Sequence, residues 1–221
     1  AIPLLAAAEF LIVNGDTLTN LDLAPLVASH RRSDALVTMA VVPNSEPQKY
    51  SGLAVDEEGC VTGVVPRGSA QPSYHFFGVQ LVNVEALAAA PGGVPCETVA
   101  QLYPALIANR RGAVRAFHAD AEYHDIGTPA DYLETSLRMA EREGGDTAAE
   151  ARARYAHAKV ERSILWDDVV LGDGVMLKEC IVTDGVRVPA DTSWHGVTMR
   201  AAEGELAPGE RRIGELAIAS L

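Results

Sequence analysis

Up to about residue 145, the chain alternates short apolar runs with stretches in which apolar residues recur at helical spacing. Phe10–Val13 and Ala35–Val42 are unbroken apolar runs of strand length, typical of strands buried on both faces of a parallel sheet that helices cover. Between them, apolar positions from Leu23 to His30 share one side of an expected helix, and His30 is interpreted as a residue of the helix end. The three segments predict a strand–helix–strand unit.

The same alternation continues through this region and predicts one α/β sheet with helices on both faces. The further strands expected are Tyr50–Val55, Cys60–Val65, Tyr74–Val82 and Val114–His118, and the further helices are Glu85–Ala90, Glu97–Asn109 and Pro129–Glu143. Thr128 is a favourable N-cap for the last helix, and Pro129 suits its first position. Gly78 interrupts its strand, which often marks a bulge or a close approach of the backbone.

From Val160 onward, aliphatic residues recur at a spacing of six, with small residues at the corners between them. The aliphatic pairs are Leu165 and Val169, Leu171 and Val175, and Leu177 and Ile181, followed after a slip of one residue by Val182 and Val186 and by Val188 and Thr192. Such a repeat indicates a parallel β-helix, of which this stretch covers less than two coils. Two irregular hairpins are the alternative. The expected domains are residues 1–145 and the tail 160–221, joined by a polar linker over 146–159.

The composition narrows the classes of function. A net charge of −12 over 221 residues argues against a protein whose main task is to bind nucleic acid. The three cysteines are widely spaced and odd in number, which predicts neither a disulfide framework nor a zinc site and points to a reducing, cytoplasmic location. No apolar run approaches the roughly 20 residues of a membrane-spanning helix, so no membrane partner is expected.

The first candidate site lies where the run Phe10–Val13 ends, at Asn14-Gly15-Asp16. Ligands of open α/β sheets collect at the carboxyl ends of strands, so Asp16 is placed to present a carboxylate to a ligand. Gly15 would let the backbone come close to that ligand. The alternative is a plain turn with a solvated Asp16.

The sequence FLIVNGD, taken with the later YHDIGTPADYLE, resembles the sugar-1-phosphate nucleotidylyltransferases, or NDP-sugar pyrophosphorylases, and is most similar to the mannose-1-phosphate guanylyltransferase-like members. The resemblance covers nearly the whole chain and implies a Rossmann-like nucleotide-diphospho-sugar transferase sheet followed by a short left-handed parallel β-helix. It implies that Asp16 and Asp125 together hold a Mg²⁺ ion. Two carboxylates combined with substrate phosphates are a ligand set that Mg²⁺ prefers. For Asp125, the alternative is a helix-entry residue that accepts hydrogen bonds from backbone N–H groups.

The resemblance also implies a sugar pocket. Gly52 matches a family glycine whose N–H meets a sugar hydroxyl, and Gly78 matches a second glycine of that pocket. Two departures stand out. The Gly-rich segment of the type GGxGTRLxPLT, which wraps the nucleotide phosphates, is absent, so the chain is expected to be a fragment of the enzyme. The family's Glu-Lys-Pro is replaced by Val65-Pro66-Arg67, where Arg67 either replaces the lysine that binds the sugar phosphate or is merely solvated.

The expected function is therefore a nucleotidyltransferase that forms an NDP-sugar, with GDP-mannose as the best candidate, and pyrophosphate from an NTP and a sugar 1-phosphate. A non-catalytic regulatory or assembly subunit on the same fold is the main alternative. A β-helix acyltransferase is a weaker one, because the repeat is short. The exposed end of so short a coil predicts that the tail packs against the catalytic domain or forms a homo-oligomer with a second copy of the chain.

Overall fold

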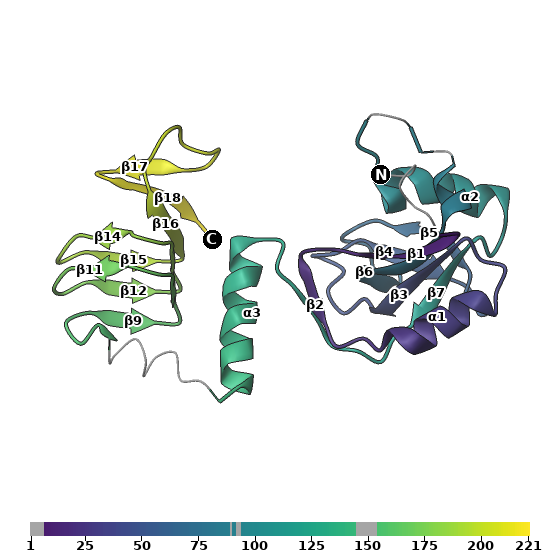
Figure 1. Ribbon diagram of the computed structural model, residues 1–221, viewed down its shortest axis with the longest axis horizontal. Coiled ribbons are helices and arrows are strands. Elements are labelled where there is room, and N and C mark those ends of the chain that lie inside the picture. The colour runs from purple at the N-terminus through teal and green to yellow at the C-terminus, as the bar shows by residue number, and fades with distance from the viewer. Residues whose placement is uncertain (1–6, 89, 92–93, 145–153) are drawn as a thin grey trace. The chain divides into compact units, whose positions relative to one another are not determined.

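The computed structural model describes residues 7–88, 90, 91, 94–144 and 154–221. By its contacts, the chain divides into two compact units, Ala1–Tyr123 and His124–Leu221, which are described separately (Figure 1). The expected linker over 146–159 lies largely outside the described residues. The expected domain boundaries at 145 and 160 stay a prediction.

The first unit is built on one mixed sheet in the order β5-β4-β6-β3-β7, with β1 also paired to β6. The strands are β1 (Glu9–Val13), β3 (Val37–Pro43), β4 (Gly52–Val55), β5 (Val61–Val65), β6 (Tyr74–Asn83) and β7 (Val114–His118). Strands β1 and β3 both run antiparallel to β6, so they are parallel to each other with β6 between them. Strand β7 pairs parallel with β3. The strands predicted for this part of the chain therefore form, and they belong to one sheet.

Strand β1 corrects one expectation. Among the described strands it pairs with β6 alone, and Leu11 and Val13 are 36% and 51% exposed, so β1 is not a strand buried on both faces. Its neighbour in the chain, β3, does meet that description, since Val37 to Val41 are all buried. An unbroken apolar run could not distinguish the two cases, because the pattern carries no information on whether a second strand and a helix cover it.

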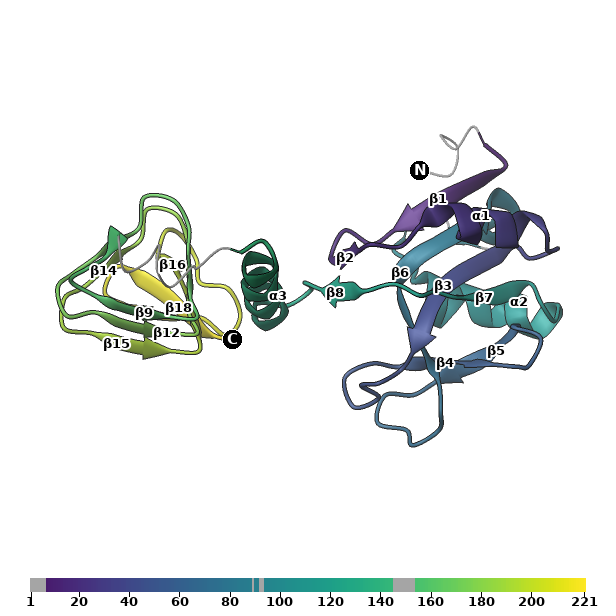
Figure 2. The same ribbon diagram turned by 90° about the horizontal axis from the view of Figure 1, so that it is seen from below.

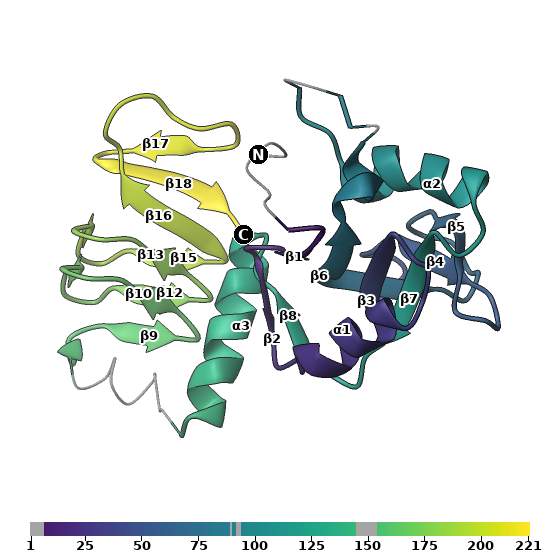
Figure 3. The same cartoon turned by 45° about the vertical axis from the view of Figure 1, so that its right-hand side comes forward.

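Helices cover both faces of this sheet (Figure 3). Helix α1 (Leu23–Arg31) begins at Asp22, whose carboxylate accepts a 2.9 Å hydrogen bond from the N–H of Ala24, and its Leu26 packs with Ala40 of β3. On the other face, Tyr103 of α2 (Tyr103–Asn109) packs in the cluster that contains Val37, Met39 and Val41.

The expected helix Glu97–Asn109 is divided in the structure. A π-helical turn, η3 (Thr98–Leu102), precedes α2, and Pro104 lies in the first turn of α2, where its missing N–H costs little. The expected helix Glu85–Ala90 is a short 3₁₀ turn, η2 (Val84–Leu87). Two short strands, β2 (Thr17–Thr19) and β8 (Tyr123–Asp125), complete the first part of the chain.

The second unit contains three small parallel sheets that follow one another around a coil (Figure 2). The first holds β9 (Lys159–Glu161), β12 (Met176–Lys178) and β15 (Ser193–His195), the second β10 (Ile164–Leu165), β13 (Ile181–Val182) and β16 (Val197–Ala201), and the third β11 (Val170–Leu171) and β14 (Arg187–Val188). Ile164 pairs with Ile181 and Met176 with Ser193, a separation of 17 residues in each case. The pairing is parallel, unlike that of hairpins.

The corners explain the slip in the six-residue pattern. Residues with positive φ recur 17 apart at each corner, namely Arg162, Glu179 and Gly196, then Asp168 and Gly185, and then Gly174 and Asp191. One side of each coil is therefore a residue shorter than the other two. The stack of coils begins before Leu165 and continues past Thr192 to Ala201. It is therefore longer than expected, since the sequence predicted less than two coils.

An antiparallel extension and a helix complete this unit. β16 continues into an antiparallel sheet with β18 (Leu216–Ser220) and β17 (Arg211–Ile213), as Figure 3 shows. Helix α3 (Pro129–Arg142) packs Leu133 and Leu137 against Ile181. This helix, which the sequence analysis assigned to the first domain, thus shares a core with the coil. Nowhere in the described ranges is a helix long and apolar enough to cross a membrane.

Candidate active site

The end of β1 is held against a bend in β6. The N–H of Asn14 donates a 2.8 Å hydrogen bond to the carbonyl oxygen of Gly78. Gly78 has a φ of +90°, and a Cβ there would lie 2.8 Å from the Cβ of Asn14. Only glycine meets both demands, so the close approach that the sequence predicted at Gly78 is with the chain itself.

Gly15 and Asp16 form the exposed turn that leads from β1 into β2. A Cβ on Gly15 would meet nothing within 4 Å, so the packing of this unit does not require glycine there. Beyond the turn, the Thr19 hydroxyl donates to the carbonyl of Glu122 at 2.7 Å, and the N–H of Glu122 donates to the Asn20 side chain at 2.9 Å. The segment after Asp16 is therefore fastened to the residues just before Tyr123.

Gly52, the first residue of β4, is buried in a tight contact. A Cβ there would lie 2.1 Å from the Ser73 hydroxyl oxygen, and the Asn44 side-chain amide donates to that same oxygen at 3.3 Å. Beside Gly52 lies a cavity of about 180 Å³, whose lining includes Tyr50 and His75. The need for glycine at 52 thus has a packing cause, and a small cavity also borders the residue.

Arg67 lies in an exposed turn beyond β5. The turn is formed by a 3.2 Å hydrogen bond from the N–H of Ser69 to the carbonyl of Pro66. Val65 pairs with Gly52 across the β4–β5 hairpin, and Arg67 lies two residues after Val65. The fold therefore brings Arg67 and Gly52 to the same end of the hairpin.

A row of aromatic rings at this edge escaped the sequence analysis. Tyr50 and His75 have ring centroids 4.2 Å apart, His75 and Tyr123 5.1 Å, and Phe77 and Tyr123 5.4 Å. His75 and Phe77 are alternate residues of β6 and share a face. Since β6 is antiparallel to β1 and Val13 pairs with Val79, the row continues past the carboxyl end of β1. No spacing in the sequence signals this row, because its rings come from three distant segments.

Asp125 ends β8, at the start of the second unit. Its Oδ1 accepts a 3.0 Å hydrogen bond from the N–H of Gly127, and its carbonyl accepts from the Thr135 hydroxyl at 3.3 Å. Thr128 caps α3, as expected, by accepting from the N–H of Asp131 at 3.1 Å. The hydrogen bond from the Gly127 N–H is what the alternative for Asp125, a helix-entry residue that accepts from the backbone, would require. This bond does not exclude a metal-binding role, since a carboxylate has about four acceptor sites.

Five of the six predicted site residues thus lie at one edge of the first unit: Gly15, Asp16, Gly52, Arg67 and Gly78. The sixth, Asp125, opens the second unit, so the shared coordination of Asp16 and Asp125 stays a prediction. Within the described part of the chain, no three His, Cys, Asp or Glu side chains cluster as a complete protein-only metal site. A Mg²⁺ site that relies on two carboxylates plus substrate phosphates does not require such a cluster.

Comparisons with known proteins agree with the motifs. The family model described as nucleotidyl transferase matches residues 3–142. A mannose-1-phosphate guanylyltransferase of Mycobacterium tuberculosis is 23% identical over 192 residues, covering 81% of this chain and 54% of the relative. A probable mannose-1-phosphate guanylyltransferase 3 of Oryza sativa subsp. japonica is 27% identical over 203 residues, covering 86% of this chain and 54% of the relative. The chain thus spans about half the length of these relatives.

The fold has solved counterparts as well. The crystal structure of HddC from Yersinia pseudotuberculosis superimposes with a TM-score of 0.53 at 22% identity, covering 63% of this chain and 59% of that one. At this identity the likeness shows the fold, and it supports the Rossmann-like α/β architecture. Taken with the family match over residues 3–142, these findings show that the chain belongs to the nucleotidyl transferase family, as a relative of the sugar-1-phosphate nucleotidylyltransferases.

Proposed function

We propose that this chain is part of a Mg²⁺-dependent enzyme that joins an NTP and a sugar 1-phosphate into an NDP-sugar and pyrophosphate. The observation that carries the proposal is the gathering of Gly15, Asp16, Gly52, Arg67 and Gly78 at one edge of a sheet of the nucleotidyl transferase family. These residues come from four separate stretches of the sequence, and the strand register alone brings them to that edge.

The reaction needs little covalent help from the protein. A phosphate oxygen of the sugar 1-phosphate attacks the α-phosphorus of the NTP in line, and the bond to pyrophosphate breaks. The work of the residues is to position two anionic substrates and to balance their charge. In the proposal, Asp16 and Asp125 hold Mg²⁺, which when bound offsets the negative charge of the phosphates. Within the first unit, the hydrogen bonds of Thr19 and Asn20 to Glu122 join the segment after Asp16 to the segment that leads to Tyr123.

The other residues have proposed roles in binding the sugar phosphate. The N–H of Gly52 meets a sugar hydroxyl at the small cavity beside it. Gly78 keeps the sugar-pocket role that the resemblance implies, although it does not line this cavity. The exposed guanidinium of Arg67 binds the sugar phosphate, because it presents five donors in a planar fork that suits phosphate oxygens. The aromatic row from Tyr50 to Tyr123 offers ring faces against which the sugar ring packs.

GDP-mannose is the proposed product because several relatives are named mannose-1-phosphate guanylyltransferases. A second crystal structure of HddC, with a TM-score of 0.50 and 22% identity, is described as a complex with GMP-PN, which is consistent with a guanine nucleotide. The test is pyrophosphate release from each pairing of GTP, ATP, UTP and dTTP with mannose, glucose and galactose 1-phosphates, using the complete gene product. The expected result is highest turnover with GTP and mannose 1-phosphate.

A regulatory subunit on the same fold is the second candidate. The observation in its favour is that Val65-Pro66-Arg67 replaces the expected Glu-Lys-Pro and leaves Arg67 exposed in a turn. Such a subunit would bind the nucleotide sugar but release no pyrophosphate with any substrate pair. Binding of GDP-mannose, measured by calorimetry alongside the turnover assay, therefore separates the two candidates.

Three unbonded cysteines, Cys60, Cys96 and Cys180, support the proposed reducing cytoplasmic location.

For the tail, we propose a short left-handed parallel β-helix that serves assembly. Two observations support this proposal. Parallel strand pairs recur every 17 residues, and corner residues with positive φ recur at the same interval. Removing everything after Glu143 would be a poor test, because Leu133 and Leu137 of α3 pack against Ile181. Replacement of the exposed Val170 and Met176 by Glu leaves the core intact, and light scattering then reports whether an oligomer seen with the unaltered protein is lost. An unaltered protein that is monomeric excludes the assembly role.

A further inference from the structure

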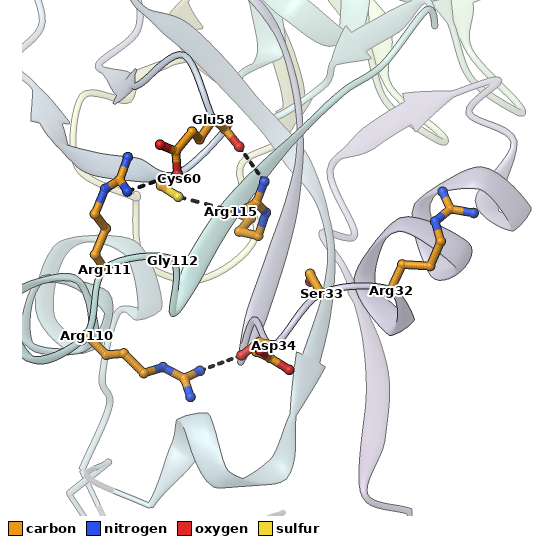
Figure 4. Close-up of a pocket in the computed structure, with 9 residues that line it drawn as sticks. All are labelled: Arg32, Ser33, Asp34, Glu58, Cys60, Arg110, Arg111, Gly112 and Arg115. Atoms are coloured by element: carbon orange, nitrogen blue, oxygen red, sulfur yellow. Dashed lines mark hydrogen bonds and ion pairs between the residues drawn. The ribbon is translucent and has the colours of Figure 1, made fainter.

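A pocket of about 550 Å³ lies apart from the candidate active site, in the first unit (Figure 4). Its side chains come from the segment that follows α1, from the turn between β4 and β5, and from the α2–β7 connection with the start of β7. The charged members of the lining are Arg32, Arg110, Arg111, Arg115, Asp34 and Glu58. Its size is in the range of small-molecule sites, which span about 300–1,000 Å³.

The pocket belongs to the opposite edge of the sheet from Asp16. Asp34 precedes the amino end of β3, and Arg110 and Arg111 precede the amino end of β7, which is parallel to β3. Asp16 follows the carboxyl end of β1, which is also parallel to β3. A ligand in this pocket would therefore not occupy the substrate edge.

The pocket is cationic in a chain of net charge −12, since four guanidinium groups meet two carboxylates in its lining. Two of the arginines bind uncharged acceptors and keep their charge unbalanced. Arg110 donates to the carbonyl of Asp34 at 2.6 Å, and Arg115 donates to the carbonyl of Glu58 and, at 3.4 Å, to Cys60 Sγ. Each bond uses one of five N–H donors of its guanidinium, so both side chains keep donors for a ligand.

The third arginine serves as a support. Arg111 forms ion pairs with Asp56 at 2.7 Å and Glu58 at 2.9 Å, which raise its pKa, and Figure 4 shows it turned toward Glu58. Asp56 also accepts from the N–H of Cys60 at 2.8 Å, so the β4–β5 turn is fixed by its own side chain. The wall that carries Glu58 is therefore held in shape before any ligand arrives, by one guanidinium that Asp56 and Glu58 share.

We propose that this pocket binds a phosphate-bearing small molecule, with Arg110 and Arg115 as its cationic contacts. Guanidinium groups suit phosphate because their planar donors match its oxygens in pairs. The pocket admits a compact anion, and the acidic surface of the whole chain argues against a long polyanion such as nucleic acid. The lining also contains the Asp34 carboxylate, whose negative charge is unfavourable for a bound anion. Among the contacts of the described residues, no arginine side chain pairs with this carboxylate.

The test is calorimetric titration of the chain with inorganic phosphate and, separately, with pyrophosphate. The expected result is saturable binding that Arg110→Gln and Arg115→Gln each weaken by about tenfold or more, the usual worth of a hydrogen bond to a charged group. Asp34→Asn should tighten binding, which a purely structural role of the pocket would not produce. Arg212→Gln is the matched control, because Arg212 also donates to a main-chain carbonyl, that of Gly204 at 3.3 Å, in the other unit.

Three results would overturn the proposal. The first is that neither anion binds the unaltered chain in a saturable way. The second is an equal loss of affinity in Arg110→Gln and Arg212→Gln, which would mean a general effect of charge. The third is loss of binding in Arg67→Gln with unchanged binding in Arg110→Gln and Arg115→Gln, which would place the phosphate at the proposed substrate site. Thermal unfolding of each variant, expected to stay close to that of the unaltered chain, shows that a loss of binding is not a loss of fold.

Discussion

The N–H of Asn14 donates to the carbonyl oxygen of Gly78 at 2.8 Å, and this bond fixes the end of β1 to the bend in β6. Gly78 adopts a φ of +90°, a conformation that residues with a Cβ rarely adopt. The Cβ that any other residue would bring lies 2.8 Å from the Asn14 Cβ. The position of the Gly15–Asp16 turn therefore depends on the absence of a side chain 62 residues further along the chain.

Gly78→Ala is expected to lower the free energy of unfolding by about 2 kcal/mol, because it combines an unfavourable φ with a steric overlap. Urea unfolding, followed by circular dichroism, measures the change. Gly63→Ala in β5 is the matched control, since its new Cβ would meet nothing within 4 Å and its φ is not positive. Equal losses in the two variants would show that β6 accommodates a side chain at 78.

Asp16→Asn and Asp125→Asn are expected to reduce turnover of the complete gene product by at least about a hundredfold while leaving unfolding unchanged, because each keeps its shape but loses the charge that holds Mg²⁺. Binding of Mn²⁺ in place of Mg²⁺, followed by water-proton relaxation, gives a readout that does not depend on activity. Asp120→Asn, an exposed residue before the Tyr123 segment, is the control. Unchanged Mn²⁺ affinity in both variants would contradict the two-carboxylate site.

Tyr103 makes the stability of the first unit depend on alkaline pH. Its side chain is buried and donates a 2.7 Å hydrogen bond to Gln80 Oε1, and burial raises the pKa of Tyr103 to about 12. Below about pH 10, both the folded and the unfolded chain keep the phenol proton. Between about pH 10 and 12, the unfolded chain loses that proton first, so stability falls with rising pH, by about 2 to 3 kcal/mol in total.

Urea unfolding from pH 8 to 12 measures this fall. Tyr103→Phe removes the titrating group and should flatten that part of the curve, although the variant starts less stable because Gln80 loses its partner. The other titrating residues contribute alike to both chains and cancel in the difference. A difference between the two chains that stays constant from pH 8 to 12 would mean that Tyr103 is no harder to ionise in the fold than in the unfolded chain.

Local patterns in the sequence predicted the helices and strands well. They predicted less well which segments, far apart in the sequence, pack against one another. The apolar run of β3 and the cap of α3 at Thr128 formed as expected, because each depends on residues close in the sequence. The exposure of Leu11 and Val13 in β1 was missed, since it depends on which strands flank β1. His30 lies on the buried side at the end of α1, as expected, but its bridge between the Thr38 hydroxyl at 2.8 Å and the Asn83 side chain at 3.1 Å was not predicted.

The candidate site shows the same division. Gly15 and Asp16 are predicted site residues because they follow an apolar run, and Arg67 because it stands where the resemblance implies a lysine that binds the sugar phosphate. The aromatic row was missed, since Tyr50, His75 and Tyr123 meet only when three distant segments pack together. The arginine-lined pocket was missed for that reason too, because its side chains come from separate loops at the amino ends of strands. Sequence spacing carries no signal for either feature.

Gly172 is expected to be the residue of the coil least tolerant of a side chain. A Cβ there would lie 2.5 Å from the backbone nitrogen and 2.7 Å from the Cα of Ala190, on the next coil. The two coils are joined at this point by a 2.9 Å hydrogen bond from the N–H of Gly172 to the carbonyl of Val188. Gly172→Ala must therefore push the coils apart or bend one of them, and we expect a loss of about 1 to 3 kcal/mol in the free energy of unfolding, typical of an overpacked core.

The double variant Gly172→Ala with Ala190→Gly tests the cause. If the main-chain atoms of Ala190 create the overlap, removing the Ala190 methyl group restores little stability, because its nitrogen and Cα remain in place. Substantial recovery in the double variant would show instead that the two side chains compete for space, and that the backbones of successive coils can separate. Thermal unfolding of the three chains, with the single variant Ala190→Gly as the reference, gives the coupling between the two positions.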